Sequence, residues 1–461
     1  MNASQNPFRR LLGGFREGFG RQLYTLVLPI VIQNLITSAV SMMDVVMLGQ
    51  VDQTSLAASS LASQVQFLLN IVYFGLSSAL VILASQYWGK RDMKTIAKIL
   101  GIGLTMCVFF STLATVLALL IPGGLMKIWT NDKELAKSGA VYLRYVALSY
   151  FFAGFSQPYL AIMKSCERVK LSTVISSITM GLNVILNAIL IFGLLGFPAM
   201  GIMGAALATS ISRGVELVIC LFDFGRQKLL PKSLKNMFAI PKALIKDFAK
   251  YSLPAFGNDA LWGLAFNMNS IIMGRLGSDI VAANSVMTVA RDLVTTVGFA
   301  ISSASSILLG KEIGAGDLEK AKQDASSVVK VTLMVSAVQG LILLLISPIV
   351  PQFVKISDTA KHYLQIMLVI NTVYQVGMMY NTVTIASLFR CGGDSRYGLI
   401  LDTVSMWGVA VPLGLLAAFV LKLPPLWVYV FMCADEFVKL PFSITHYKKG
   451  TWVRNLTRDF E

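Results

Sequence analysis

Charged residues and histidine are scarce in this sequence. Charged side chains make up 14% of the chain, whereas a soluble domain carries roughly a quarter. His362 and His446 are the two histidines, and no HExxH segment occurs, so no metal-hydrolase motif is present. No nucleophile–base pattern was found either. We therefore expect no enzyme, no catalytic residue, no cofactor and no nucleic-acid partner.

Cysteine is scattered, and no secretory leader is expected. The five cysteines show no CxxC spacing and no obvious pairing, which is typical of small buried hydrophobes. Residues 1–22 lack an apolar core and a small-residue cleavage site, so we expect no cleavable signal peptide. Their arginines instead predict a cytoplasmic segment that orients the first helix.

Apolar residues are abundant and occur in long runs. They account for 55% of the 461 residues, and the mean hydropathy is +0.69. Runs long enough to cross a bilayer, about 20 residues each, recur along the whole chain. They predict an all-α polytopic membrane protein with twelve transmembrane helices, near residues 22–48, 55–86, 95–121, 138–163, 171–194, 201–224, 251–274, 280–309, 325–350, 360–388, 397–421 and 425–446.

Lysine and arginine alternate between the predicted loops. The loops at 49–54 and 195–200 contain neither residue, whereas one set of alternate loops and both termini are basic. This positive-inside pattern predicts an even number of spans with both termini in the cytoplasm. The basic residues of these loops include Lys90, Arg91, Lys94, Lys164, Arg168, Lys170, Arg226, Lys228, Lys232, Lys311, Lys320, Lys322, Arg390 and Arg396.

The sequence repeats itself at a constant offset of 225 residues. The segment Leu28–Asp92 aligns without a gap on Leu253–Asp317. Six predicted helices separate the copies, so the two six-helix lobes have the same orientation and form a parallel pseudo-two-fold repeat, a plan common in transporters. The predicted organisation is residues 1–22 cytoplasmic, 23–224 N-lobe, 225–250 basic cytoplasmic linker, 251–447 C-lobe and 448–461 cytoplasmic tail.

A polar stripe in the first predicted helix ends in a carboxylate. Gln33, Thr37, Ser41 and Asp44 share one helical face, and Pro29 is predicted to act as a hinge near that face. No lysine or arginine lies within a turn of Asp44. A charge at mid-membrane costs about 2.5–3.5 kcal/mol even on insertion scales, so we expect Asp44 to be functional.

Polar residues recur in other helices, and each has an ordinary explanation as well. Ser, Thr and Asn stripes often serve only as interhelical hydrogen bonds, worth about 0.6 kcal/mol. Arg213 and Glu216 fit a local i,i+3 ion pair, and Asp435, Glu436 and Lys439 can compensate one another. In the alignment of the repeat, Asn269 is equivalent to Asp44, and Arg291 is equivalent to Gln66. The candidate substrate-cavity residues are Gln33, Thr37, Ser41, Gln66, Asp259, Trp262, Arg291 and Asn269.

Several motifs in fixed order resemble the multidrug and toxic compound extrusion (MATE) family of secondary transporters, of the bacterial type. They are Leu28-Pro29, then MMDVVMLGQV around Asp44, SLAASSLA (55–62), SQYWGKRD (85–92), LPAFGNDALWGL (253–264) and LFRCGGDSR (388–396). The resemblance extends over nearly the full length. It implies a cation-coupled antiporter, driven by H⁺ or Na⁺, that exports organic cations, drugs or toxic compounds by alternating access.

The resemblance also implies an ion-coupling site. The family's first-helix aspartate falls on Asp44, and its companions fall on Asn183 and Thr209. A fifth-helix acid of the family is Asn187 here, a departure that leaves H⁺ and Na⁺, with a Na⁺ site at Asp44, both open. Another branch of the family has a C-lobe cation site formed by a tyrosine and an aspartate four residues later on the tenth helix. Tyr374 is present here, but the aspartate position is Met378, so we do not expect that site.

The resemblance further implies a monomer in a bacterial inner membrane, with the lipid bilayer and small organic cations as partners. One alternative is a lipid-linked glycan or lipid flippase of the same plan. Such a protein needs several cations to hold phosphates, and the sequence offers Arg213 and Arg291.

Overall fold

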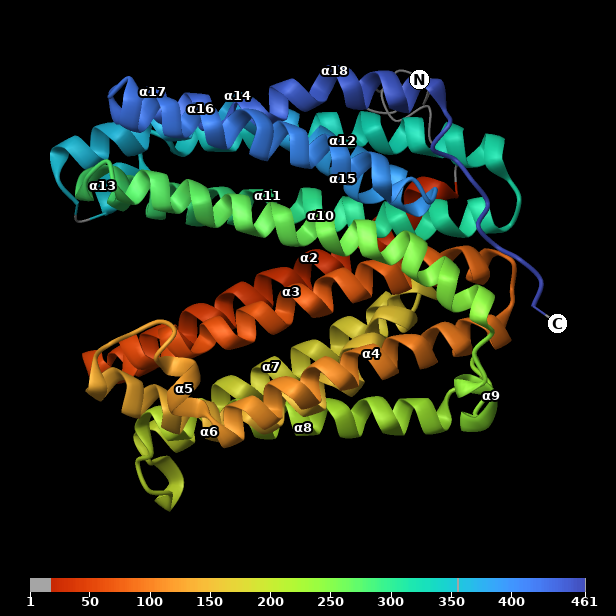
Figure 1. The fold of residues 1–461 in the computed structure, drawn as a ribbon, viewed down its shortest axis with the longest axis horizontal. Coiled ribbons are helices and arrows are strands. Elements are labelled where there is room, and N and C mark those ends of the chain that lie inside the picture. The colour runs from red at the N-terminus through yellow and green to blue at the C-terminus, as the bar shows by residue number, and fades with distance from the viewer. Residues whose placement is uncertain (1–17, 355, 461) are drawn as a thin grey trace, which may run out of the picture. The chain divides into compact units, whose positions relative to one another are not determined.

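The structure is a computed structural model that describes residues 18–354 and 356–460. Helices account for nearly all of the described part, and no strand occurs in it. Residues 1–17, the larger part of the predicted N-terminal segment, lie outside the described residues. Figure 1 shows the helices coloured along the chain, from α2 in red to α18 in blue.

Six long helices form the first half of the chain. Asp52 precedes α3, where Ser55 donates hydrogen bonds to its carboxylate from both its hydroxyl and its amide; these bonds lower the pKa of this exposed carboxyl. The helix bounds are α2 Phe19–Gly49, α3 Gln53–Gly89, α4 Met93–Leu120, α6 Lys133–Ser165, α7 Val169–Phe192 and α8 Gly201–Arg226, with the short α5 Pro122–Met126, η1 Leu194–Gly196 and α9 Leu234–Phe238.

The second half has the same plan with more interruptions. Three π-helical segments, named η2 to η4, interrupt its last helices, and Cys433 separates α17 from α18. The bounds are α10 Lys242–Gly274, α11 Ser278–Gly314, α12 Leu318–Ile346, α13 Val350–Phe353, α14 Asp358–Val383, η2 Thr384–Phe389, α15 Ser395–Thr403, η3 Val404–Ala410, α16 Val411–Leu415, η4 Leu416–Val420, α17 Pro425–Met432 and α18 Ala434–Lys449.

The prediction of twelve spans is confirmed. Each predicted range falls on a long helix or on a run of consecutive helices. Among the described residues, nine helices are both long and apolar enough to cross a membrane. The main differences are at helix ends: α10 begins at Lys242 rather than near residue 251, and α12 at Leu318 rather than near 325. Hydropathy predicts these helix starts too late in the chain, because each helix extends beyond its apolar run into the region where water replaces lipid.

The repeat appears in the helix bounds themselves. α3 and α11 are both 37 residues long, and their first and last residues differ by the same offset of 225 as the sequence repeat. The ends of α2 and α10, at Gly49 and Gly274, and the starts of α4 and α12, at Met93 and Leu318, keep that offset as well. The positions at which helices begin and end, and not only the apolar character of the chain, are therefore duplicated.

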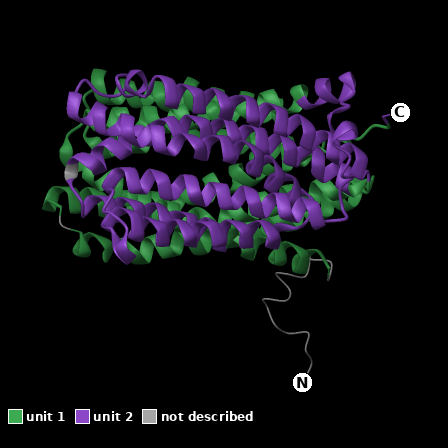
Figure 2. Cartoon of the chain, turned by 90° about the horizontal axis from the view of Figure 1, so that it is seen from below, with its two compact units in different colours: residues 1–31, 89–91, 249–459 green, residues 32–88, 92–248, 460–461 purple. Residues whose placement is uncertain are grey.

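The chain divides into two compact units (Figure 2). One comprises residues 1–31, 89–91 and 249–459, and the other residues 32–88, 92–248 and 460–461. We call the first the C-terminal unit and the second the N-terminal unit. The boundary crosses α2 between Val31 and Ile32, within a turn of Pro29.

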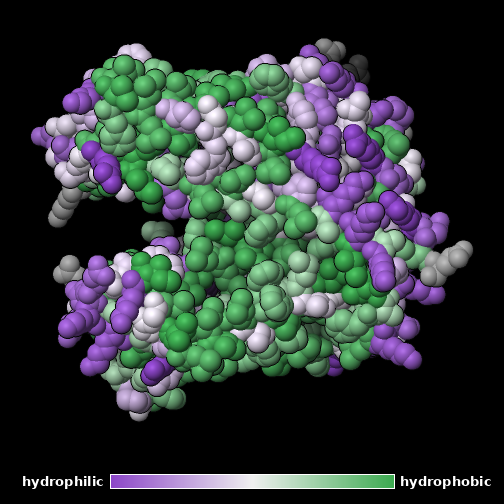
Figure 3. All heavy atoms as spheres, viewed as in Figure 1, coloured by the Kyte–Doolittle hydropathy of each residue, from purple (hydrophilic) through white to green (hydrophobic). Residues whose placement is uncertain are grey.

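Each unit has its own packed interior and an apolar outer surface. Leu80, Ile99 and Leu143 are buried in the N-terminal unit, and Ile272 and Met379 belong to the core of the C-terminal unit. Many leucines, valines and isoleucines along the long helices remain exposed, and apolar side chains cover much of the surface in Figure 3, with hydrophilic ones gathered toward the helix ends. Such a surface suits a lipid environment.

Within each unit, helix association depends on close packing, because lipid is as apolar as the side chains. At Gly204 of α8, a Cβ atom would lie 2.5 Å from the carbonyl oxygen of Leu190 in α7. Small residues allow helix backbones to approach in this way. The contact matters because α7 and α8 carry Asn183, Asn187 and Thr209.

Gly204→Ala is expected to destabilise the protein by about 1–3 kcal/mol, since α7 and α8 must separate. Gly181→Ala in α7 is the matched control, because nothing lies within 4 Å of its Cβ position. That control should be neutral or stabilising by up to about 1 kcal/mol. Unfolding of the two variants in detergent measures the difference, and equal stabilities would contradict the close contact.

Candidate functional site

The polar stripe of α2 packs against a polar stripe of α7. Gln33 donates a hydrogen bond from Nε2 to Ser176 Oγ at 2.9 Å, and the Thr37 hydroxyl approaches Met180 Sδ at 3.5 Å. Further along, Asn187 contacts Asp44. All three pairs are separated by 143 residues. A constant separation means that α2 and α7 run in the same direction in register.

Asp44 is the first member of a chain of polar side chains. Asn187 Nδ2 donates to Asp44 Oδ1 at 2.5 Å and lies 3.3 Å from Asn183 Oδ1. Asn183 Nδ2 in turn lies 3.4 Å from Thr209 Oγ1 on α8. The structure thus brings together all four predicted ion-coupling residues from three helices. Whether they bind an ion remains a prediction.

The charge of Asp44 has no cationic partner among the described residues. Its side chain is half-buried, and its hydrogen-bond donor is the neutral amide of Asn187. Tyr142 of α6 lies within electrostatic reach of Asp44 and hydrogen-bonds with Ser63 of α3. A carboxylate in this setting is suited to bind a proton or another cation.

The oxygen atoms around Asp44 also fit a small hard cation. Asn187 is only 1% exposed, so water cannot readily reach it, and its Oδ1 has no hydrogen-bond partner among the described residues. Carboxylate, amide carbonyl and hydroxyl oxygens are the ligands that hard cations prefer. Asp44, Asn183, Asn187 and Thr209 supply these three kinds of oxygen.

The other candidates of the N-terminal unit lie on the same helices but are less engaged. Thr37 and Ser41 are exposed and donate hydrogen bonds to the carbonyls of Gln33 and Thr37, one turn earlier. Gln66 on α3 is half-buried, and within the described part no hydrogen bond links it to Asp44, Asn183, Asn187 or Thr209. Their place in a substrate cavity stays a prediction.

The candidates of the C-terminal unit form two separate groups. Arg390 donates two hydrogen bonds to Asp259, at 2.6 and 3.2 Å. The Arg291 guanidinium lies 5.2 Å from the ring centre of Phe266, which is 4.3 Å from the ring of Trp262. Asp259 is therefore a neutralised acid, while Arg291 and Trp262 belong to an aromatic group.

Asn269, the repeat counterpart of Asp44, has a different environment. Its Oδ1 is buried without a hydrogen-bond partner among the described residues. An amide at this position carries no charge, so the two halves of the repeat keep the helix pattern but differ in electrostatics. The expected local pair of Arg213 and Glu216 is confirmed, with Nη1 and Oε2 at 2.8 Å.

Sequence reasoning missed some partners. Met180 contacts Thr37, Tyr142 lies within electrostatic reach of Asp44, and Arg390 is the partner of Asp259. Met180 lies on the face of α7 that carries Asn183 and Asn187, so helical spacing could have suggested it. Nothing in the sequence links Arg390 to Asp259, because 131 residues separate them.

The fold and the arrangement of this site can be compared with known proteins. The MatE family model matches residues 29–189 and 254–416, one match in each half of the repeat. The chain belongs to the MatE family. This protein is a transporter rather than an enzyme, and it is a multi-pass membrane protein.

Relatives of this family cover almost the whole chain. The uncharacterized transporter YisQ of Bacillus subtilis is 23% identical over 434 residues, covering 94% of this chain and 95% of the relative. A probable multidrug resistance protein NorM of Mesorhizobium japonicum is 25% identical over 418 residues, covering 87% of each. Multidrug and toxin extrusion protein 1 of Oryctolagus cuniculus is 23% identical, covering 92% of this chain and 74% of that protein.

Solved structures of related transporters have the same fold. An outward-facing multidrug resistance MATE family transporter of the MOP superfamily superposes with a TM-score of 0.84 at 19% identity, covering 96% of this chain and 98% of that one. A MOP superfamily transporter from Pyrococcus furiosus gives 0.84 at 18% identity, covering 95% and 97%. The twelve-helix fold predicted from the sequence is thereby confirmed.

The bond between Asp44 and Asn187 can be measured by a double-mutant cycle. We expect Asp44→Ala and Asn187→Ala to couple by about 1.5–3 kcal/mol, because one partner is charged. Asn183→Ala with Thr209→Ala is the control cycle: that contact is neutral and long, 3.4 Å, and should couple by about 0.6 kcal/mol. Unfolding in mixed micelles measures both. A coupling for Asp44–Asn187 no larger than the control would contradict the geometry.

Proposed function

We propose that this MatE family transporter is a cation-coupled antiporter that exports organic cations, including drugs or toxic compounds. The observation that carries the proposal is Asp44, a half-buried carboxylate in a membrane-spanning helix whose donor is an amide and not a cation. The names of relatives described as multidrug resistance or multidrug and toxin extrusion proteins support the class of substrate.

The coupling ion is a proton or Na⁺, held at Asp44. Protonation would neutralise the carboxylate, and Na⁺ would be bound with oxygens of Asn183, Asn187 and Thr209. In either case, the negative charge that attracts an organic cation is cancelled when the ion is bound. Ion and substrate therefore compete for one charge, and coupling follows if they favour opposite-facing states.

Pro29 is the proposed hinge of this exchange. It lies inside α2, one turn before Gln33, and removes a backbone N–H from the helix. The boundary between the two compact units crosses α2 next to it. A change of direction at Pro29 would alter the register of α2 on α7, and hence the contact between Asp44 and Asn187.

A lipid-linked glycan or lipid flippase is less well supported. Phosphate binding needs cations that are free to meet it, yet Arg213 pairs with Glu216 at 2.8 Å. Arg291 lies over Phe266 and within 3.4 Å of the Asp292 carboxylate. We further propose a monomer in a bacterial inner membrane with both termini in the cytoplasm, as the alternation of basic loops favours.

Asp44→Asn should abolish ion-driven efflux while leaving insertion and abundance intact. The amide keeps the size of the side chain but can neither lose a proton nor offer a charge to Na⁺. The measurement is export of a fluorescent organic cation such as ethidium from proteoliposomes. Imposed proton and Na⁺ gradients, applied separately, identify the coupling ion.

Asp52→Asn is the matched control, because Asp52 is an exposed acid at the start of α3. It should transport like the wild type. Wild-type rates in Asp44→Asn would contradict the coupling role. If neither gradient drives export by the wild type, and a drug-sensitive host gains no resistance to cationic dyes, the antiporter proposal itself is wrong.

A further inference from the structure

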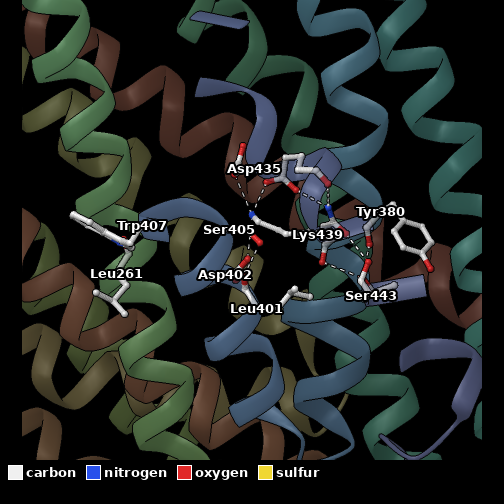
Figure 4. Close-up of polar contacts among 12 residues, drawn as sticks. Leu261, Tyr380, Leu401, Asp402, Ser405, Trp407, Asp435, Lys439 and Ser443 are labelled. Carbon is white, nitrogen blue, oxygen red and sulfur yellow. Dashed lines mark hydrogen bonds and ion pairs between the residues drawn. The ribbon is translucent and has the colours of Figure 1, made fainter. Parts of the chain in front are cut away.

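Four charged side chains of α15 and α18 meet inside the C-terminal unit (Figure 4), whereas Asp44 lies on α2. Lys439 of α18 is 1% exposed. Its Nζ lies 3.1 Å from Asp402 Oδ1 of α15, 3.1 Å from Asp435 Oδ2 and 2.9 Å from Glu436 Oε1. The ammonium donates a hydrogen bond to Glu436 and forms ion pairs with Asp402 and Asp435. We call these four residues the Lys439 cluster.

The acids of the Lys439 cluster outnumber its cation. Three carboxylates against one ammonium leave two negative charges uncompensated if every acid is ionised. All three acids are buried. Burial makes uncompensated charge expensive, and like charges that share a site disfavour one another. An added positive charge would therefore stabilise the cluster.

The neighbouring side chains do not supply that charge. Arg291 is within electrostatic reach of Tyr374, Tyr429 and Cys433, but its guanidinium contacts Asp292 and Phe266. Asp259 lies within electrostatic reach of Asp402, and the guanidinium of Arg390 forms its ion pair with Asp259. The other titratable groups on α18 are His446, Tyr447, Lys448 and Lys449, near the end of that helix, with His446 paired to Asp394. Those on the elements packed against α18 are Asp358, Lys361, His362, Tyr363, Tyr374 and Tyr380 of α14, Arg396 and Tyr397 of α15, and Tyr429 of α17, with Cys433 between α17 and α18.

Within the described part of the chain, a buried oxygen atom of the cluster has no hydrogen-bond partner. Both oxygens of Glu436 have partners, because Lys439 donates to Oε1 and Asn381 Nδ2 donates to Oε2 at 2.8 Å. The hydroxyl of Ser443 in turn donates a hydrogen bond to Asn381 Oδ1. Asp435 is 3% exposed, and its Oδ1 is buried without a hydrogen-bond partner among the described residues. A bare oxygen of a buried carboxylate is costly. It is the natural position for an added proton.

We propose that Asp402, Asp435, Glu436 and Lys439 form a proton-binding site in the C-terminal unit, separate from Asp44. One proton adds to the carboxyl set, at Asp435 Oδ1, and reduces its net charge by one. No bond other than O–H forms or breaks. The site is suited to release the proton when the carboxylates separate, since their mutual repulsion then falls.

The helices that carry the cluster are irregular close to it. The π-helical η3 begins at Val404, directly after the turn that holds Asp402, and Pro441 lies inside α18 two residues after Lys439. Such irregularities allow helices to bend locally. Bending of either helix would change the distance of Asp402 from Lys439. Use of the proton in transport rests on the proposed function, whereas its binding does not.

The test uses the full-length protein in lipid, in an Asp44→Asn background that removes the first acid. At about pH 7, exposed carboxyls are ionised, so the infrared C=O stretching band of a protonated carboxylic acid reports a buried proton. We expect this band in Asp44→Asn. It should fall at least twofold in Asp44→Asn/Asp435→Asn, and also in Asp44→Asn/Asp402→Asn, which tests the same site from α15.

Two further variants separate proton binding from a structural role. Glu216→Gln in the same background changes a buried acid that is fully paired with Arg213 and Ser156, so the band should stay. Lys439→Met removes the ammonium, so the band should persist or grow.

A band that is missing from Asp44→Asn, or that survives both the Asp435 and the Asp402 substitutions unchanged, would overturn the proposal. Failure of wild-type export would refute the proposed function but leave the band in place.

Discussion

A carboxylate inside a membrane-spanning helix must find a hydrogen-bond donor, a cation or a proton, and this constraint organises the polar interior of the protein. The cost of leaving such a group uncompensated, about 2.5–3.5 kcal/mol even on insertion scales, is a large fraction of the total stability margin of a domain. Asp259 meets the constraint with Arg390, and Glu216 with Arg213. Asp44 meets it only in part, through the amide of Asn187.

The two halves of the repeat solve this problem differently. Their helices begin and end at equivalent positions, so the backbone plan was duplicated. The N-terminal unit places one acid in a chain of neutral amides and hydroxyls. The C-terminal unit carries an amide at the equivalent position, Asn269, and concentrates its acids around Lys439 on later helices. A single scaffold thus carries two distinct electrostatic designs.

The contact between α2 and α7 shows how packing turns a pattern into a site. Each helix alone shows a polar face, which is compatible with ordinary interhelical hydrogen bonds. Their constant separation of 143 residues places one face against the other in parallel register. Close approach of α7 and α8 at Gly204 then brings Thr209 toward Asn183. The four-residue group depends on both contacts.

The sequence by itself determined the number of spans, the repeat and the importance of Asp44. Apolar length, basic loops and the cost of buried charge are local properties, and they do not depend on which helices meet. Tertiary structure alone decided the partners. Asp259 met Arg390 across 131 residues, and Asp402 joined Lys439 from another helix. Helical spacing predicts which residues share a face, but only packing determines which face lies opposite.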